Sequence, residues 1–426
     1  MRCPAQRTCG VGLVFVMALA GVASAGEIQQ ITVLHTSDLH GSVLPFDEAR
    51  NRPARGSLAR VSAAVEQVRR EVDHPVILLD SGDTLQGTPL EEYFNVKQSE
   101  MSPTVEAMNR IGYEAMAVGN HEFNFGLEPL RRAERQASFP FLSANTVDRE
   151  TGEPAFPPYE ILERGGIRIG VLGLTTPNIP NWESPENYRG LAFADIVDSA
   201  RTWVARLRRE RDVDLVIVLA HTGFESDLDT HETNETAYEN FGARLLGVEG
   251  IDVLLTGHAH RDIAPREVSG IVVSQPSSRG RRLTRIDLEL ERVEEGWSLR
   301  SWLGANLDLD ESPVDDDLVE AFRARQGILR EHLEQPLTEV DRAVSVRGCR
   351  LGDCAALDLI HEVQLDASGA DISLASLLSS STPDLAPGPV HRRWVRSLYV
   401  YANTLMAVSV SGAQLKDILE LSLIHI

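Results

Sequence analysis

Short apolar runs alternate with amphipathic stretches over residues 28–300. Because the apolar runs are continuous rather than alternating, we expect both faces of their sheet to be covered. This order of elements is typical of an α/β domain, which we place at residues 27–310. The predicted strands are Ile31–His35, Val76–Asp80, Ala115–Val118, Ile167–Leu174, Leu215–Ala220 and Val253–Thr256, and the predicted helices between them are Leu58–Val72, Thr104–Ile111 and Asp195–Arg209.

A further helix is predicted where this domain ends. Ser312 and Pro313 provide an N-cap and a first helical residue, and the three aspartates that follow favour the positive end of a helix dipole. We expect a helix over Val314–Leu333, within a linker at residues 311–335 that joins two domains.

Residues 336–426 form the second expected domain. It contains a helix candidate at Ala356–Ala367 and an apolar stretch at Val395–Val410. The sequence stops inside what reads as an unfinished amphipathic helix from Gly412 onward, so we expect this domain to be truncated.

The first 25 residues have the organisation of a signal peptide. Arg2 and Arg7 precede the apolar run Val11–Val22, and Ala23-Ser24-Ala25 supplies small residues for cleavage. The apolar run is shorter than the ~20 residues that a membrane-spanning helix needs, and no later segment is long enough. We therefore expect a secreted protein, located in the periplasm or at the cell surface.

Two cysteines remain once this signal is removed, Cys349 and Cys354. In an oxidising compartment they can form a disulfide if the turn brings their Cα atoms within ~7 Å. Two free thiols are the alternative. A pair of metal ligands is less favoured, because no other cysteine remains.

The charge balance limits the partners of the chain. The sequence has 41 Lys and Arg against 63 Asp and Glu, a net charge of −22 at pH 7. A field of this sign repels phosphate, so polymeric nucleic acid is not an expected partner. Phosphate chemistry would then depend on a local cluster such as bound metal ions. The sequence does not determine the oligomeric state.

Polar residues of metal-ligand type follow five of the expected strands. Open α/β sheets place their sites outside the carboxyl ends of the strands, so these segments can converge. Carboxylates, neutral imidazoles and one amide suit two divalent ions such as Zn, Mn, Fe or Co. Any single residue could instead be a cap, a turn former or a packed histidine, but five segments in order favour a metal centre. They are Ser37-Asp38-Leu39-His40-Gly41, Asp80-Ser81-Gly82-Asp83, Gly119-Asn120-His121-Glu122, Ala220-His221 and Gly257-His258-Ala259-His260.

These motifs are similar to those of the calcineurin-like metallophosphoesterases. With the signal and the second domain, they resemble the bacterial secreted 5′-nucleotidases and 2′,3′-cyclic-nucleotide phosphodiesterases. The resemblance covers about residues 28–426. It implies a four-layer αββα sandwich, followed by a linker helix and a partial α+β C-terminal domain.

The resemblance also implies roles for the motif residues. Asp83 would bridge two metal ions, and a metal-bridging hydroxide would attack phosphorus. His121 would stabilise charge or protonate the departing sugar oxygen, with Asn120 and Asn124 as further catalytic residues. The first ion is expected on Asp38, His40, Asp83 and His260, and the second on Asp83, Asn120, His221 and His258.

Asn124 bears on the choice of substrate. Many 5′-nucleotidases have an aspartate three residues after the catalytic histidine, whereas Asn124 resembles the 2′,3′-cyclic-nucleotide 2′-phosphodiesterase/3′-nucleotidase subgroup. Its carbonyl can accept a hydrogen bond from the ring but lacks the charge that favours an imidazolium. If Asn124 only caps a turn, a 5′-nucleotidase or nucleotide-sugar hydrolase is the alternative.

The second domain resembles the first half of a 5′-nucleotidase C-terminal domain. Arg350, Tyr401 and Asn403 match positions that contact the nucleotide, with Tyr401 stacking on the base. A packed tyrosine and a turn asparagine are the alternative for the last two. A glycine- and arginine-containing loop of the family is replaced by Ser373–Leu378, and a second aromatic residue would lie beyond Ile426, so the sequence assigns no base.

We therefore expect a secreted, dinuclear, metal-dependent phosphoesterase with a nucleotide substrate, and the cyclic-nucleotide subgroup is favoured. A metal-bound surface protein without catalytic activity is the alternative from another class. The intact pair Asn120 and His121 argues against it.

Overall fold

The computed structural model describes residues 27–294, 296–349, 352–377, 379, 381–400 and 404–424. The predicted signal peptide at residues 1–25 lies outside these ranges. Among the described residues, no helix combines the length and the apolar character that crossing a bilayer requires.

Two six-stranded mixed sheets form the centre of the larger domain. In the first, with the order β16-β15-β1-β4-β5-β6, strands β1, β4, β5 and β6 are parallel, and β15 pairs antiparallel with both β1 and β16. In the second, with the order β13-β14-β12-β11-β9-β8, the four inner strands are parallel and both edge strands antiparallel. The strands are β1 Ile28–Thr36, β4 Val76–Asp80, β5 Ala115–Ala117, β6 Phe141–Leu142, β15 Arg282–Val293 and β16 Gly296–Asp308, then β8 Tyr159–Arg164, β9 Ile167–Thr175, β11 Leu215–His221, β12 Val253–Thr256, β13 Asp262–Val268 and β14 Ile271–Pro276.

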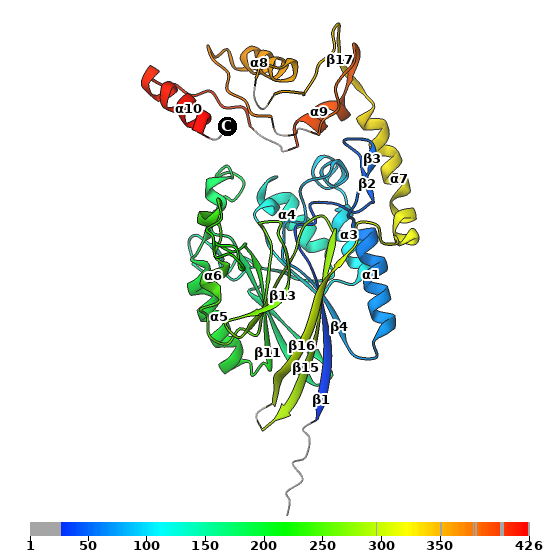
Figure 1. The fold of residues 1–426 in the computed structure, drawn as a ribbon, viewed down its shortest axis with the longest axis vertical. Helices are drawn as coiled ribbons and strands as arrows, with labels where there is room; N and C mark the ends of the chain where they lie inside the picture. The colour runs from blue at the N-terminus through cyan, green and yellow to red at the C-terminus, as the bar shows by residue number, and fades with distance from the viewer. Residues whose placement is uncertain are drawn as a thin grey trace, which may run out of the picture.

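Helices cover the outer face of each sheet, which gives four layers (Figure 1). Helices α1, α3 and α4 pack against the first sheet, with α7 against α1 and α2, and α5 and α6 pack against the second sheet. The expected αββα sandwich is therefore confirmed. The helices are α1 Leu58–Glu71, α2 Pro89–Glu91, α3 Pro103–Ile111, α4 Leu127–Gln136, α5 Ile196–Glu210, α6 Gly242–Leu245 and α7 Asp316–Leu333, with short turns η1 Glu92–Lys97, η2 His121–Phe123, η3 Ile179–Asn181 and η4 Ala237–Glu239. Two short strand pairs complete the domain, β2 Phe46–Asp47 with β3 Arg52–Pro53 and β7 Thr146–Asp148 with β10 Leu191–Phe193.

Strand β11 shows why the predicted strands are continuously apolar. Leu215, Ile217 and Leu219 belong to the core between the two sheets. Val216 and Val218 belong to the core between the second sheet and its helices. Both faces of the strand are buried, so neither favours polar residues.

Helix α7 begins later than the sequence predicts. Its N-cap is Asp315, whose side chain accepts a hydrogen bond from the Leu318 amide at 3.0 Å. The prediction of Ser312 as the N-cap is wrong, because the Ser312 hydroxyl donates to the Leu309 carbonyl at 3.1 Å instead. The end of the helix at Leu333 agrees with the prediction.

The C-terminal region has a small core of its own, which includes Ile360 and Trp394. Cys349 and Cys354 lie in this core and form a disulfide, with Cα atoms 5.2 Å apart. The alternatives of two free thiols and of a metal pair are therefore wrong. The elements are β17 Pro336–Val340, which pairs antiparallel with β18 Gly388–His391, and the helices α8 Ala355–Ser368, α9 Arg392–Leu398 and α10 Gly412–Ile424.

Two arginines of α9 join this region to the larger domain. Arg393 donates to the Glu48 carbonyl at 2.9 Å, and Arg396 pairs with Glu92 at 2.9 Å. The C-terminal region therefore lies over the end of the sandwich that carries the loops following β1 and β4 (Figure 1).

Candidate active site

Five loops meet at the carboxyl ends of β1, β4, β5, β11 and β12. The first three strands belong to one sheet and the last two to the other. This is the edge at which open parallel sheets place their ligands. The convergence of loops far apart in the sequence is therefore a consequence of the fold.

The first group of side chains consists of Asp38, His40 and His260. The Nε2 atoms of the two histidines are 3.0 Å apart, and His260 Nε2 is 3.3 Å from Asp38 Oδ1. Asp38 is fully buried and also accepts hydrogen bonds from the Ser37 hydroxyl at 2.6 Å and the His258 amide at 3.1 Å. Its orientation is therefore fixed by the protein.

The second group consists of Asp83, His221 and His258, with Asn120 beside them. His221 Nε2 is 3.0 Å from Asp83 Oδ2 and 3.1 Å from Asn120 Oδ1. His258 Nδ1 is 2.9 Å from the same amide oxygen. The structure thus brings together all seven residues that the sequence predicts as metal ligands. Asp83, which was expected to serve both ions, lies in the second group.

The positions of the protons on the His221 and His40 rings indicate that the two ligand groups can bind cations. His221 Nδ1 is 2.7 Å from the Ser81 carbonyl oxygen, and His40 Nδ1 is 3.1 Å from that of Gln86. A carbonyl oxygen only accepts, so Nδ1 carries the proton in each neutral ring and the Nε2 lone pair faces the cluster. A lone pair 3.0 Å from a carboxylate oxygen or from a second imidazole requires a cation or a proton between the two atoms. A divalent ion with ligand distances of about 2 Å satisfies this requirement.

The electrostatics of the buried groups agree with this fit directly for His40 and His258, whereas the pKa of His221 shows that a proton takes the place of the cation there. Burial lowers the pKa of His40 to about 3 and that of His258 to about 4, so both rings are neutral, the form that binds metal. Burial opposes a charged His221, but the carboxylates of Asp83 and Asp38 raise its pKa to about 10. Burial also opposes ionisation of Asp83, yet the neighbouring imidazoles hold the pKa of this carboxyl well below its usual range.

Backbone strain is concentrated in the same loops. Left-handed φ values are rare for residues with side chains and persist where the surroundings enforce them, often at functional sites. Five of the seven proposed ligands have such values, at 53° for Asp38, 48° for His40, 60° for Asp83, 67° for His258 and 54° for His260.

Glu122 holds two of the strained loops together. Its buried carboxylate accepts hydrogen bonds from the backbone amides of Asp83 at 2.9 Å, Thr84 at 2.6 Å and Gly119 at 2.6 Å. It therefore fixes the loop after β4 against the loop after β5.

His121 lies beside the metal-ligand groups, with Nε2 3.9 Å from Asp83 Oδ2. Its Nδ1 is 2.7 Å from Asn124 Oδ1, the contact that the sequence allows. Asn124 Nδ2 in turn donates to Glu183 Oε1, and Glu183 Oε2 accepts a hydrogen bond from Asn187 at 2.7 Å. On the Nδ1 side of the ring, a carboxylate therefore contacts the asparagine and not the histidine itself.

Glu183 is a residue that the sequence analysis missed. It lies 59 positions after Asn124 in a loop that follows η3, outside any of the motifs. Its neighbour Trp182, whose ring centroid is 5.3 Å from that of His258, also shows that this loop borders the site. The predicted substrate contacts Arg350, Tyr401 and Asn403 lie outside the described residues.

Comparison with known proteins gives the family. Residues 31–262 match the calcineurin-like phosphoesterase family, and residues 332–424 match the 5′-nucleotidase C-terminal domain. The chain belongs to the calcineurin-like phosphoesterases, which use divalent metal ions, and it is a metal-dependent phosphoric ester hydrolase. Its two matched regions are those of the 5′-nucleotidase and 2′,3′-cyclic-nucleotide phosphodiesterase group.

Individual relatives agree with this grouping. A 2′,3′-cyclic-nucleotide 2′-phosphodiesterase/3′-nucleotidase of Yersinia enterocolitica is 28% identical, over 96% of this chain and 70% of the relative. A 5′-nucleotidase of Vibrio cholerae is 32% identical, over 58% of this chain and 44% of the relative. A Staphylococcus aureus structure assigned as a 5′-nucleotidase has a TM-score of 0.80 at 28% identity, covering 91% of this chain and 76% of that one.

Proposed function

We propose that the protein is a secreted nucleotide phosphoesterase with two divalent metal ions, of the 2′,3′-cyclic-nucleotide 2′-phosphodiesterase/3′-nucleotidase type. The observation that carries the proposal is the pair of three-residue ligand groups with His121 beside them. The signal peptide at residues 1–25, the linker at 311–335 and a periplasmic or cell-surface location are part of the same proposal.

The proposed roles follow from the contacts. Asp38, His40 and His260 would hold one ion and Asn120, His221 and His258 the other, with Asp83 shared. Ions bound there supply activation of water and polarisation of the phosphoryl oxygens. His121 would donate a proton from Nε2 to the leaving sugar oxygen, since Nδ1 is directed to Asn124 at 2.7 Å.

Asn124 supports the cyclic-nucleotide type over a 5′-nucleotidase. It is held between the His121 ring and Glu183 and therefore does more than cap a turn. The Yersinia enterocolitica relative, similar over nearly the whole chain, bears the name of this activity. A 5′-nucleotidase remains the second candidate, because relatives with that name cover the same two regions.

The test is phosphate release from 2′,3′-cyclic AMP, 3′-AMP and 5′-AMP in parallel, combined with metal analysis of the purified protein. We expect close to two ions per chain and turnover of the first two nucleotides. Turnover of 5′-AMP alone would contradict the cyclic-nucleotide assignment in favour of the second candidate.

Asp83→Ala tests the shared carboxylate. We expect it to lose both ions and all measurable turnover, because Asp83 would contact each ion. Asp229→Ala is the matched control, since that carboxylate is 74% exposed and pairs with Arg266 on the surface. Near-normal turnover of Asp83→Ala after metal has been removed would disprove the proposed mechanism.

A further inference from the structure

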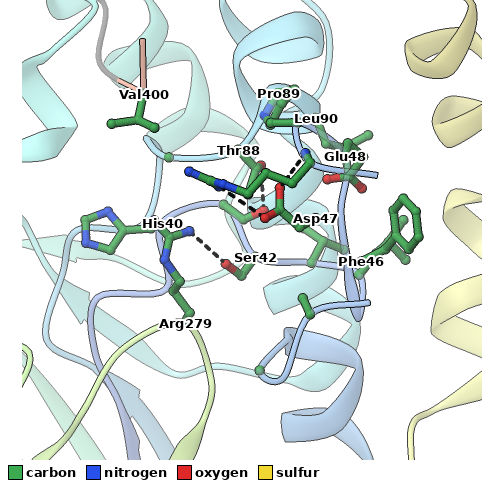
Figure 2. Close-up of a pocket in the computed structure, with 18 of the residues that line it drawn as sticks. His40, Ser42, Phe46, Asp47, Glu48, Thr88, Pro89, Leu90, Arg279 and Val400 are labelled. Atoms are coloured by element: carbon green, nitrogen blue, oxygen red, sulfur yellow. Dashed lines mark hydrogen bonds and ion pairs between the residues drawn. The ribbon is translucent and has the colours of Figure 1, made fainter. Parts of the chain in front are cut away.

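A cavity of about 570 Å³ opens beside the ligand groups. Figure 2 shows His40 and Arg279 in its wall, so both border the space that a substrate would enter. Arg279 also joins this wall to the first ligand group, because its amide donates to the Asp38 carbonyl at 2.8 Å. Two further polar residues at the ends of β1 and β4, His35 and Ser81, are fully buried and do not line the cavity. They can influence the reaction only through other residues.

Ser81 connects strands of both sheets at the end of β4. Its amide donates to the Thr36 carbonyl of β1 at 3.0 Å, within the first sheet. Its hydroxyl donates to the Leu255 carbonyl of β12 at 3.1 Å, in the second sheet. Its own carbonyl oxygen is 2.7 Å from Nδ1 of His221, the last residue of β11. One buried residue therefore links the first sheet to two strands of the second.

His35 completes the contacts of the Ser81 hydroxyl. Its Nε2 is 2.7 Å from Ser81 Oγ. The Leu255 carbonyl can only accept, so the hydroxyl proton is used there, and His35 Nε2 supplies the proton of the other bond. Burial lowers the pKa of His35 to about 3, so the ring is neutral and its single proton lies on Nε2. The hydroxyl is thus held from two sides, which gives the Ser81 side chain one orientation.

An imidazole at position 35 is not explained by packing. With the proton on Nε2, the buried Nδ1 atom is an acceptor, and it has no hydrogen-bond partner among the described residues. A buried polar atom without a partner costs about 1–3 kcal/mol. Packing alone would therefore favour an apolar residue here, and the contact with Ser81 is the feature that requires the ring.

The peptide unit between Ser81 and Gly82 is held at both of its polar groups. Asp80 Oδ1 accepts from the Gly82 amide at 2.8 Å, and the Ser81 carbonyl oxygen faces His221 Nδ1. Gly82 has a φ of 93°, and a Cβ atom there would lie only 2.7 Å from the Gly119 nitrogen. The carbonyl oxygen therefore has a fixed direction, and the His221 ring takes its orientation from it.

His221 belongs to only one of the two ligand groups. Its Nε2 is 3.0 Å from Asp83 Oδ2 and 3.1 Å from Asn120 Oδ1. In the first group, the His40 ring is directed by a different carbonyl, that of Gln86 at 3.1 Å. A change at Ser81 should therefore act mainly on one of the two proposed ions.

We propose that Ser81 and His35 are positioning residues for the second metal ion. They hold the Ser81 carbonyl oxygen in the place from which it directs His221 Nε2 at that ion. The inference rests on the proposed function, since it takes the two-ion centre as given. It extends that function by assigning the support of one ion to two residues outside the ligand set.

The test is calorimetric titration of Zn²⁺ into protein from which metal has been removed with a chelator. We expect the wild type to bind two ions. In Ser81→Ala and in His35→Phe, one ion should bind about tenfold to a hundredfold more weakly, the usual effect of losing a residue that orients a metal ligand. The affinity for the other ion should change little. His35→Gln keeps an N–H donor near the position of Nε2 and should recover part of the loss.

Ser62→Ala is the matched control. This buried hydroxyl also has a partner, Asp315 Oδ2 at 2.6 Å, but it lies on α1. The control should lose stability without a change in either Zn²⁺ affinity. Ser81→Ala removes a single oxygen atom, so it keeps the test valid if His35→Phe fails to fold. Unchanged affinities for both ions in Ser81→Ala, or an equal loss for both, would overturn the inference.

Asn120→Ala identifies the ion that is affected. This variant lacks one expected ligand of the second ion, so only the first should still bind tightly. Adding Ser81→Ala should then cause little further loss, and a further loss of about tenfold or more would place the effect of Ser81 on the first ion and reject the assignment.

The failure of the proposed function has a different signature. A wild type that binds two ions but releases phosphate from no nucleotide would disprove that function, while the Zn²⁺ affinities of the variants would still test the positioning role. A wild type that binds no Zn²⁺ would reject both.

Discussion

The orientation of the His121 ring depends on Asn124 and Glu183. Asn124 accepts from Nδ1, and Glu183 accepts from the Asn124 amide group. The Asn187 amide donates both to Glu183 and, at 3.1 Å, to the Asn124 carbonyl, so the chain of contacts is closed. An asparagine between His121 and Glu183 fixes the ring without placing a full negative charge against its Nδ1 atom.

Glu183→Ala tests this positioning role. Without the carboxylate, the Asn124 amide loses its acceptor and the His121 ring loses its fixed orientation, so we expect kcat on an aryl phosphodiester to fall roughly tenfold to a hundredfold. Metal content should not change, because the Glu183 carboxylate accepts from Asn124 and Asn187 and is not one of the proposed ligands. Glu183→Gln keeps one acceptor and should recover part of the loss. An unchanged kcat in Glu183→Ala would show that Glu183 has no positioning role.

At this scale the sequence predicts ligands better than it predicts supporting residues. Asp38, His40 and Asp83 follow strands directly, in short motifs whose place at a sheet edge is determined by the topology. Glu183 and Arg279 reach the site from loops with no periodic pattern, and only the folded chain brings them there. The spacing of residues along the sequence does not indicate such contacts.

Elements with two buried faces are the ones that the sequence predicts well. Strands β4 and β12 have the predicted bounds, because in each a continuous apolar run is followed at once by the polar residues and glycine of a loop. Strand β17 was not predicted, since four of its five residues are exposed and its pattern shows no buried face. The start of α7 was placed too early because Ser312-Pro313 matches a general N-cap pattern, whereas Asp315 makes the actual contacts.

Asp315→Ala tests the N-cap of α7. The side chain accepts from the Leu318 amide and from the Ser62 hydroxyl of α1 at 2.6 Å, so it joins two helices. We expect the free energy of unfolding to fall by about 1–2 kcal/mol, measured by urea denaturation. Asp315→Asn retains an acceptor and should lose less. Asp317→Ala is the exposed control in the first turn, and an equal loss there would contradict the cap assignment.

The molecule as a whole should be stabilised by its metal ions. Removing them leaves Asp38 and Asp83 buried close to each other, which disfavours the folded state. An ion at a hundred times its Kd contributes about 2.7 kcal/mol to stability. We therefore expect treatment with a chelator to lower Tm by roughly 5 °C or more and to abolish turnover, and added divalent metal to restore both.

The control for this experiment is Asp83→Ala, in which the chelator should have little left to remove. If metal analysis shows that the ions have been removed and the wild-type Tm is unchanged, bound metal does not stabilise the folded protein. Retained turnover in the same sample would contradict the metal-dependent mechanism.

Each proposed ion would take ligands from both sheets, since Asp38, His40, Asp83 and Asn120 follow strands of one sheet and the histidines at 221, 258 and 260 belong to the other. The two sheets approach closely elsewhere, at Gly173 of β9, where a Cβ atom would lie 2.3 Å from that of Leu142. Any side chain in that place would separate the sheets and with them the two halves of the coordination sphere. A glycine outside the ligand motifs would therefore help to hold the two halves of the proposed metal centre at their spacing.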